Sequence, residues 1–166
     1  MLLSAGGFGL SEIDRTVAVL AERFADVQFL AIAGRNADLH DALVEAAGRH
    51  PGQIVPFGFV ENMHELMAAS DLAVTKCGGL TSSECLALGL PMLILKPIPG
   101  QEERNADHLL EIGAAVRSHS HAHTVFKLGA LLENPGRLAA MARAARAAAR
   151  PRAAFDIAAI VLGAGS

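Results

Sequence analysis

The sequence predicts an α/β protein with a Rossmann-like, doubly wound parallel sheet of six strands flanked by helices, followed by C-terminal helices. Between residues 1 and 117, short apolar runs alternate with helical patterns, which is typical of parallel strands joined by helical crossovers. The runs are continuous, as expected for strands buried on both faces. With 166 residues, 52% of them hydrophobic and 19% charged, the chain is long and apolar enough for one domain with its own core.

The expected elements follow in chain order. Strands are expected at Met1–Ser4, Val27–Ala33, Ile54–Phe57, Leu72–Thr75, Pro91–Leu95 and Ala114–Arg117. The helices between them are expected at Ser11–Phe24, Ala37–His50, Glu61–Ala69, Thr81–Leu88 and Gln101–Ile112. Beyond the sheet, Pro-containing breaks separate helices at Thr124–Glu133, Arg137–Arg150 and Arg152–Leu162. We therefore expect a single domain over residues 1–166, with an alternating core at 1–117 and C-terminal helices at 118–166.

Composition argues against several classes of protein. The formal net charge of −3 gives no general attraction for nucleic acid, and Trp and Tyr are absent as base-stacking platforms. Two cysteines, Cys77 and Cys85, make neither a disulfide framework nor a convincing metal site. No apolar run reaches the roughly 18 residues of a membrane-spanning helix, and no signal peptide is recognisable. A reducing cytoplasm is the expected location.

Glycine-rich turns follow the first and fourth expected strands. The first contains Gly6, Gly7 and Gly9, and the second is Gly78-Gly79-Leu80-Thr81. Backbone N–H groups with no Cβ in the way can approach a phosphate, and the dipole of the following helix adds attraction. The dinucleotide fingerprint is not met, because Glu12 stands where its third glycine belongs. The alternative interpretation is a tight strand-to-helix turn.

Glu84 has two interpretations. Thr81-Ser82-Ser83-Glu84 fits a capping box, in which a Glu three residues after the cap bonds back to the N–H of the cap residue. Alternatively, Glu84 lies one turn into a helix aimed at a ligand, where its two carboxylate oxygens accept the hydroxyls of a ribose. The local pattern alone favours capping, and position does not decide between the two.

Other polar and aromatic residues follow the remaining strands. Gln101 and Glu102 open the fifth expected helix, where they can bond sugar hydroxyls, and Asn105 either does the same or holds the loop. Acids in a first helical turn also have a simpler explanation, since they complement the helix dipole. Phe59 and Val60 suit a flat nucleobase, or else staple a loop to the core.

Two further clusters have ordinary explanations. His119, His121 and His123 would share a face on a strand and could then ligate a metal, but the intervening serines favour a loop. Arg143, Arg146 and Arg150 share a helical face, which usually means a solvated surface and less often contact with an anionic membrane. We expect no metal site.

Together the motifs resemble a known family. The GG-x-G turn, then GRN, GFVENM, TK-x-GG-x-T-x-x-E and PIPGQE followed by Asn105 resemble the C-terminal half of GT-B glycosyltransferases. They are most similar to the group containing the bacterial lipid II glucosaminyltransferase and the monogalactosyl- and processive glucosyl-diacylglycerol synthases. The resemblance covers residues 1–117, and its most specific block is 75–105. PGQE before Asn105 favours the glycolipid synthases.

The resemblance implies a site for a UDP-hexose donor. Phe59 and Val60 would flank the uracil, and Glu84 would take the ribose hydroxyls. The N–H groups of Gly79, Leu80 and Thr81 would face the diphosphate, with the Gly6–Gly9 turn in the same cleft. Gln101 and Glu102 would contact the hexose. The donor is a substrate, and no cofactor is implied.

The resemblance also implies a division of labour. The chain starts inside its first expected strand, so we expect the N-terminal acceptor domain to be absent. The hexose would pass to a lipid such as diacylglycerol bound by that domain, which would also carry the catalytic base. This half would therefore contain no catalytic residue and would be inactive alone. We expect peripheral contact with the inner face of the plasma membrane, and self-association through the apolar C-terminal segment 153–162.

Alternatives remain open at this point. Related galactolipid synthases carry GPG where this chain has Gly78-Gly79-Leu80, so glucose, galactose and N-acetylglucosamine all stay candidates. The architecture is shared by nonhydrolysing UDP-N-acetylglucosamine 2-epimerases, whose motifs match less well. A third possibility is a non-catalytic donor-binding subunit of a split glycosyltransferase. The fourth is a nucleotide-binding module with no transferase role.

Overall fold

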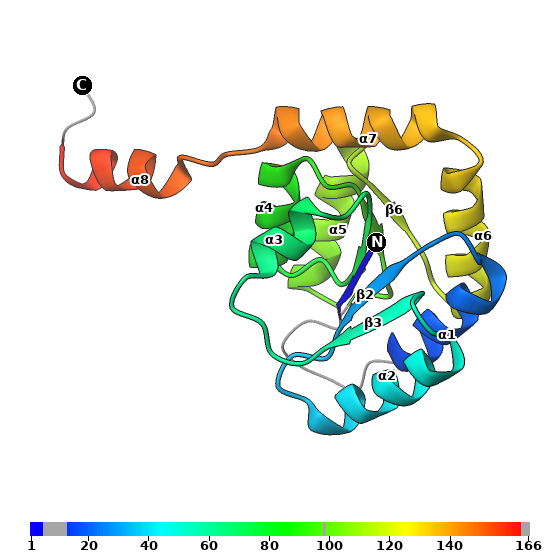
Figure 1. Cartoon of the computed structure of the whole chain (residues 1–166). Coiled ribbons are helices and arrows are strands. Elements are labelled where there is room, and N and C mark those ends of the chain that lie inside the picture. Colours follow the sequence, from blue (N-terminus) through cyan, green and yellow to red (C-terminus); the bar gives the residue numbers. More distant parts are fainter. Residues whose placement is uncertain (5–12, 98, 164–166) are drawn as a thin grey trace.

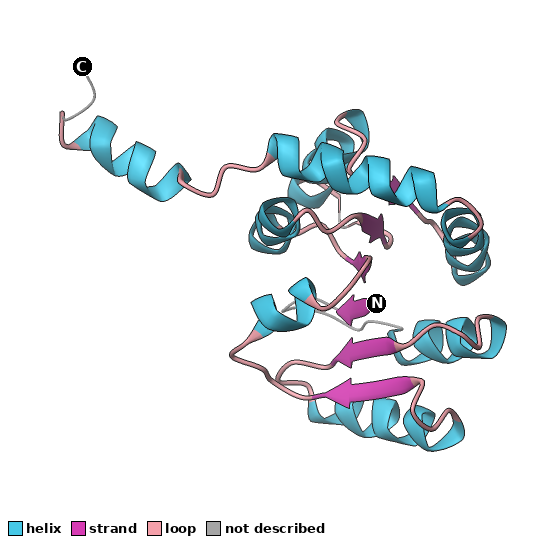
Figure 2. Cartoon of the chain, turned by 45° about the horizontal axis from the view of Figure 1, so that its top comes forward, coloured by secondary structure: helices cyan, strands magenta, loops and turns pink. Residues whose placement is uncertain are grey.

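A parallel sheet of six strands organises the protein in the order β3-β2-β1-β4-β5-β6, which confirms the predicted fold class. The computed structural model describes residues 1–4, 13–97 and 99–163. Figure 2 shows the strand arrows running in one direction, with helices on both sides of them. The strands are β1 (Leu2–Ser4), β2 (Phe29–Ile32), β3 (Ile54–Phe57), β4 (Ala73–Thr75), β5 (Met92–Ile94) and β6 (Ala115–Arg117).

The strand order reverses at β1. This strand pairs with β2 on one side, where Leu3 lies opposite Ala31, and with β4 on the other, where Leu3 lies opposite Val74. The chain first runs outward from β1 to β3 and then returns to build β4 to β6. In open parallel sheets, ligands bind beyond the carboxyl ends of the strands at such a switch point.

Two helical layers cover the faces of the sheet (Figure 1). The helices are α1 (Ile13–Arg23), α2 (Ala37–Arg49), α3 (Met63–Ala68), α4 (Gly79–Leu88), α5 (Gln101–Glu111), α6 (His121–Leu132), α7 (Pro135–Ala148) and α8 (Ala153–Val161). One buried cluster joins Val17 of α1, Leu43 of α2 and Leu128 of α6 to the sheet. A second joins Met67, Cys85 and Leu109, from α3, α4 and α5. Burial of these side chains holds the strands and their carboxyl-edge loops in place.

Helix α7 connects the two layers. It contacts both α6 and α4, and it contributes Met141 to the first cluster and Ala145 to the second. At Gly89, which ends α4 in a left-handed conformation with a φ of 66°, an added Cβ would collide with the side chain of Arg146. The left-handed conformation therefore favours glycine there, and a larger residue would also displace the Arg146 side chain.

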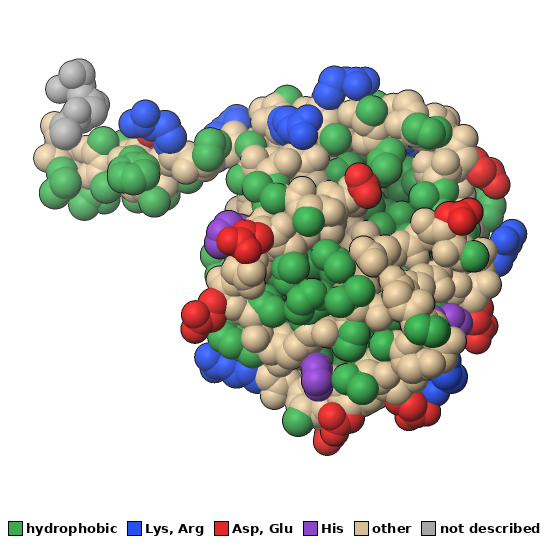
Figure 3. Space-filling model, in the orientation of Figure 1, with side chains coloured by type: hydrophobic (Ala, Val, Ile, Leu, Met, Phe, Trp, Pro, Cys, Tyr) green, Lys and Arg blue, Asp and Glu red, His purple; other side chains and the backbone are tan. Residues whose placement is uncertain are grey.

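Helix α8 projects away from the rest of the chain (Figure 1). Its sequence is almost wholly apolar, yet Phe155 is 71% exposed and Ile160 is 74% exposed. Figure 3 shows hydrophobic side chains gathered on this helix. The apolar surface that the sequence predicted for the C-terminal segment is thus uncovered within the described chain, and surfaces of this kind promote association.

Several element boundaries differ from the prediction. Helix α4 begins at Gly79, two residues before the expected Thr81. Helix α6 begins at His121 instead of Thr124, with Ser120 as its cap. His121 and His123 therefore lie in a helix, and no strand aligns the three histidines. The predicted cap Ser11 lies outside the described residues.

We predict that the apolar surface of α8 causes the protein to self-associate. The double variant Phe155→Gln/Ile160→Gln removes two of its most exposed apolar side chains and should lower the average mass toward that of a monomer. Sedimentation equilibrium over a range of concentrations measures this. Val44→Gln is the matched control, because Val44 is an exposed apolar residue of a different helix, α2. A wild-type chain that stays monomeric throughout would contradict the prediction.

Candidate functional site

The turn between β4 and α4 presents backbone N–H groups at the carboxyl edge of the sheet. Gly78 is the N-cap of α4, with φ −61° and ψ 151°, and it makes no side-chain cap bond. The N–H of Ser82 donates to the carbonyl of Gly78 at 2.9 Å, which is the first bond of the helix. The N–H groups of Gly79, Leu80 and Thr81 precede that bond, so they are the donors that a helix start leaves without an intrahelical partner.

Neither glycine of this turn is needed for the fold itself. Gly78 and Gly79 do not have positive φ angles. A Cβ built on either would have no described atom within 4 Å. No described atom therefore lies where a Cβ of either residue would stand.

Some helices begin with a side-chain cap, and others, namely α3, α4, α5 and α8, begin without one. Helices α2, α6 and α7 are capped by the side chains of Asn36, Ser120 and Asn134, each accepting a backbone N–H. Helices α4 and α5 instead follow Gly78 and Gly100. A side-chain cap occupies donors of a helix start, so the first donors of α4, which follows Gly78, have no side-chain cap.

The capping interpretation of Glu84 is wrong. Because α4 begins at Gly79, Thr81 is already its third residue and Glu84 its sixth. A capping box needs the Ser or Thr at the cap position itself, which Gly78 occupies. The side chain of Glu84 is exposed, so it is accessible to a ligand.

The start of α5 lies beside this turn. Gly100 has a φ of 103°, a conformation that favours glycine, and its N–H donates to the Glu103 carboxylate at 3.4 Å. Gln101 is exposed and Glu102 is half-buried. The amide of Asn105 donates to the carbonyl of Cys77 at 2.8 Å. Asn105 therefore has the loop-holding role that was one of its two predicted interpretations.

Phe59 and Val60 follow β3 at the same edge. Phe59 is 58% exposed, whereas Val60 is partly buried against the second core cluster. The guanidinium of Arg35 lies over the Phe59 ring, 4.6 Å from its centroid. Arg35 belongs to the GRN motif that follows β2, but its contact with Phe59 depends on the pairing of β2 with β3 and is not readable from either motif alone.

Both cysteines are fully buried free thiols. Burial, assisted by the nearby Glu102, raises the pKa of Cys77, and burial with a smaller effect of Glu84 raises the pKa of Cys85 to about 12. The thiolate is the reactive form of cysteine. Neither group is therefore a nucleophile at neutral pH.

Two of the predicted site residues, Gly79 and Asn105, line the same cavity. The cavity has a volume of about 360 Å³, and Ser82 and His108 also line it. Ser4 at the end of β1 pairs with Thr75 at the end of β4, three residues before Gly78. Gly6, Gly7 and Gly9 themselves lie outside the described residues.

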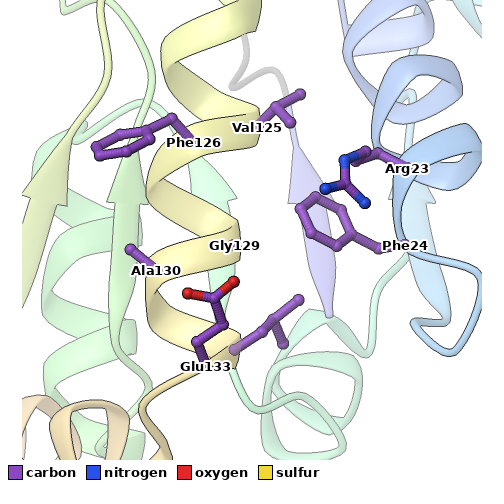
Figure 4. Close-up of a pocket in the computed structure, with 8 residues that line it drawn as sticks. Arg23, Phe24, Val125, Phe126, Gly129, Ala130 and Glu133 are labelled. Atoms are coloured by element: carbon purple, nitrogen blue, oxygen red, sulfur yellow. The ribbon is translucent and has the colours of Figure 1, made fainter.

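A larger cavity lies elsewhere. It has a volume of about 490 Å³ and lies between the end of α1 and α6, where Arg23 and Phe24 lie across from Val125, Gly129 and Glu133 (Figure 4). None of the described residues of the predicted site lines it.

The side chains of His119, His121 and His123 contact one another or Thr16. His121 Nδ1 lies 3.0 Å from the hydroxyl of Thr16, and the rings of His119 and His123 stack at 5.5 Å. Over the described ranges, no three His, Cys, Asp or Glu side chains form a group suited to a metal ion. In the same part of the chain, no helix has both the length and the hydropathy needed to cross a bilayer.

Comparisons with known proteins agree with this geometry. Residues 10–156 match the profile of the Glycosyltransferase family 28 C-terminal domain. The chain is 33% identical over 141 residues to a processive diacylglycerol beta-glucosyltransferase of Bacillus pumilus, covering 85% of this chain and 37% of that protein. The chain thus spans less than half the length of this relative.

Solved structures share the fold. MurG of Acinetobacter baumannii superposes with a TM-score of 0.79 at 21% identity, over 98% of this chain and 49% of that one. A UDP-GlcNAc 2-epimerase of Neisseria meningitidis, solved bound to UDP-GlcNAc, gives a TM-score of 0.72 at 18% identity, over 98% of this chain and 43% of that one.

Since Glu84 does not cap α4, its removal should hardly affect stability. We predict that Glu84→Ala changes the free energy of unfolding by less than about 0.5 kcal/mol, as for other exposed surface positions. Ser120→Ala is the contrasting control, because Ser120 accepts the His123 N–H as the cap of α6, and its loss should cost about 1 kcal/mol. Urea unfolding measures both, and an equal loss in Glu84→Ala would restore the capping role.

The raised pKa of Cys85 predicts a loss of stability at alkaline pH. The unfolded chain releases the thiol proton near 9.0, whereas the folded chain holds it to about 12. This stabilisation is complete below the unfolded pKa and is lost as pH rises through the interval. Between pH 8 and 10 the unfolding free energy should fall by about 1 kcal/mol from this group. Cys85→Ala should lack that component, and an unchanged pH dependence in this variant would contradict the prediction.

Proposed function

Because the chain belongs to the family of glycosyltransferase family 28 C-terminal domains, we propose that it is the donor-binding half of a two-domain enzyme. In this proposal the chain holds a UDP-hexose, and the second half binds a lipid acceptor such as diacylglycerol. The hexose passes from UDP to a hydroxyl of that lipid. The name of the Bacillus pumilus relative, a diacylglycerol beta-glucosyltransferase, supports the lipid acceptor and favours glucose as the sugar.

The start of α4 carries the proposal. Its first N–H groups have no side-chain cap, and the glycines before and within its first turn leave the backbone open. This start follows β4, the strand beside the switch point of the sheet. An anion there meets both free N–H donors and the positive end of the helix dipole. We assign the diphosphate of the donor to Gly78, Gly79, Leu80 and Thr81.

Neighbouring residues accommodate the rest of the donor in this proposal. The exposed carboxylate of Glu84, one turn into α4, accepts the two ribose hydroxyls. Phe59 and Val60 flank the uracil, and Gln101 and Glu102 at the start of α5 face the hexose. Gly6, Gly7 and Gly9, which lie outside the described residues, remain assigned to the donor in this proposal.

The chemistry assigned to this chain is electrostatic. As the glycosidic bond breaks, negative charge develops on the departing UDP. The N–H groups at the start of α4 are fixed before the reaction, so they stabilise that charge without reorganising. The proposal places the base that deprotonates the acceptor hydroxyl in the other half of the enzyme, and no proton transfer is assigned to residues of this chain.

Two alternatives compete with this proposal, an epimerase-like domain and a non-catalytic subunit of a split glycosyltransferase. The fold is shared with a UDP-GlcNAc 2-epimerase, but at 18% identity this likeness concerns architecture alone. A subunit of a split glycosyltransferase would hold the donor in the same way and would differ in its partner. The family match and the glucosyltransferase relative therefore favour the two-domain transferase.

We also propose peripheral contact with an anionic membrane at the cytoplasmic side. Arg143 and Arg146 on α7, with Arg150 just beyond it, are exposed. Arginines in such a position are attracted to acidic lipid headgroups. Contact with the bilayer would bring the donor site near a lipid acceptor.

Nucleotide affinity tests the proposal. Glu84→Ala should weaken UDP binding by about 1.5–3 kcal/mol, the range for a hydrogen bond to a charged group. Isothermal calorimetry measures this, with Glu22→Ala as the matched control, because Glu22 is an exposed glutamate of α1 outside the proposed site. UDP should bind more tightly than CDP, ADP or GDP, and EDTA should leave binding intact. Equal affinity for ADP and UDP would refute the proposed donor site.

A further inference from the structure

Two side chains tie the β4–α4 turn to the start of α5. The thiol of Cys77 donates to the backbone carbonyl of Glu102, with 3.0 Å between sulfur and oxygen. In the opposite sense, the amide of Asn105 donates to the backbone carbonyl of Cys77 at 2.8 Å. A single residue, Cys77, is thus bonded through both its side chain and its backbone to the first two turns of α5.

The surroundings of Cys77 keep this connection in place. Its side chain is fully buried within the second core cluster. Burial also raises the pKa of the thiol, so the sulfur keeps the proton that it donates. Asn105 is half-buried, and its bond to Cys77 spans 28 positions of the sequence.

The two segments joined in this way serve different parts of the proposed ligand. Cys77 directly precedes Gly78 and Gly79, which the proposed function assigns to the diphosphate. Glu102 lies at the start of α5, which it assigns to the hexose. In a nucleotide-sugar these two groups are covalently adjacent, so the two protein segments must keep a fixed separation to contact both at once. Small displacements of such segments weaken binding and catalysis strongly.

We propose that Cys77 and Asn105 are positioning residues that hold the diphosphate turn and the start of α5 in register, so that the site recognises a nucleotide-sugar more tightly than the free nucleotide. This inference rests on the proposed function, which assigns the diphosphate to the β4–α4 turn and the hexose to the start of α5. Neither residue touches the ligand in this proposal. Their effect is on the hexose contribution to affinity, since UDP alone makes no contact with the start of α5 in this proposal.

The test compares affinities for UDP and UDP-glucose. Calorimetry gives the ratio of the two dissociation constants for the wild-type chain and for Cys77→Ala and Asn105→Ala, each of which removes one hydrogen-bond donor. In both variants we expect the preference for UDP-glucose over UDP to fall roughly three- to tenfold, the size expected for one hydrogen bond. Cys77→Ser keeps a donor at the same position and should restore most of the preference.

Cys85→Ala is the matched control. Cys85 is a free thiol that is also 0% exposed in the second core cluster, so its truncation creates a similar small cavity. It should lower the melting temperature without changing the ratio of affinities. A loss of the preference in Cys85→Ala as large as in Cys77→Ala would mean that general loosening of the core explains the effect, and it would overturn the inference.

The remaining outcomes separate the inference from the proposed function. Suppose the wild-type chain binds both ligands, and Cys77→Ala and Asn105→Ala have the same ratio of dissociation constants as the wild type. That result overturns the positioning role and leaves the proposed donor site intact. A wild-type chain that binds neither UDP nor UDP-glucose overturns the proposed function, and the positioning role with it.

Discussion

The structure depends on one constraint, which is that all six strands run parallel and therefore end at the same edge. After each strand the chain returns to the opposite edge through a helix. The loop after each strand and the start of the following helix therefore lie along one edge of the sheet. The reversal of strand order at β1 separates the loops on either side of it and leaves room between them. Nucleotide-sugar recognition needs several helix starts and loops in one place, and this arrangement provides them.

Core and site are built from different residues of the same elements. The strands and the inward faces of the helices are buried in two clusters, whereas Glu84, Gln101 and Phe59 are exposed. Cys77 is the exception, because it belongs to the core and also adjoins the site. Substitutions of exposed site residues should therefore affect binding more than stability. Cys77 and Asn105 are the exceptions, because they adjoin both the core and the site.

The sequence predicted the fold well, because six continuous apolar runs separated by helical patterns leave few alternatives to a parallel sheet. It predicted less well where a helix begins. Thr81-Ser82-Ser83-Glu84 has the local pattern of a capping box, but β4 ends at Thr75 and the backbone is free to turn at Gly78. The hydrogen bond of Asn105 to Cys77 and the cation–π contact of Arg35 with Phe59 join segments distant in sequence, and no local pattern encodes them.

Three helices begin with a side-chain cap, whereas α3, α4, α5 and α8 begin without one. Asn36, Ser120 and Asn134 cap their helices with side chains, and each such cap contributes about 1 kcal/mol relative to alanine. Gly78 brings no side-chain oxygen to α4, whose first N–H donors have no intrahelical partner. A ligand that bonds those donors replaces water at a site that the fold already holds open. Gly78 thus leaves the start of α4 without a side-chain cap. The N–H groups of its first turn are the ones that the proposal assigns to the diphosphate.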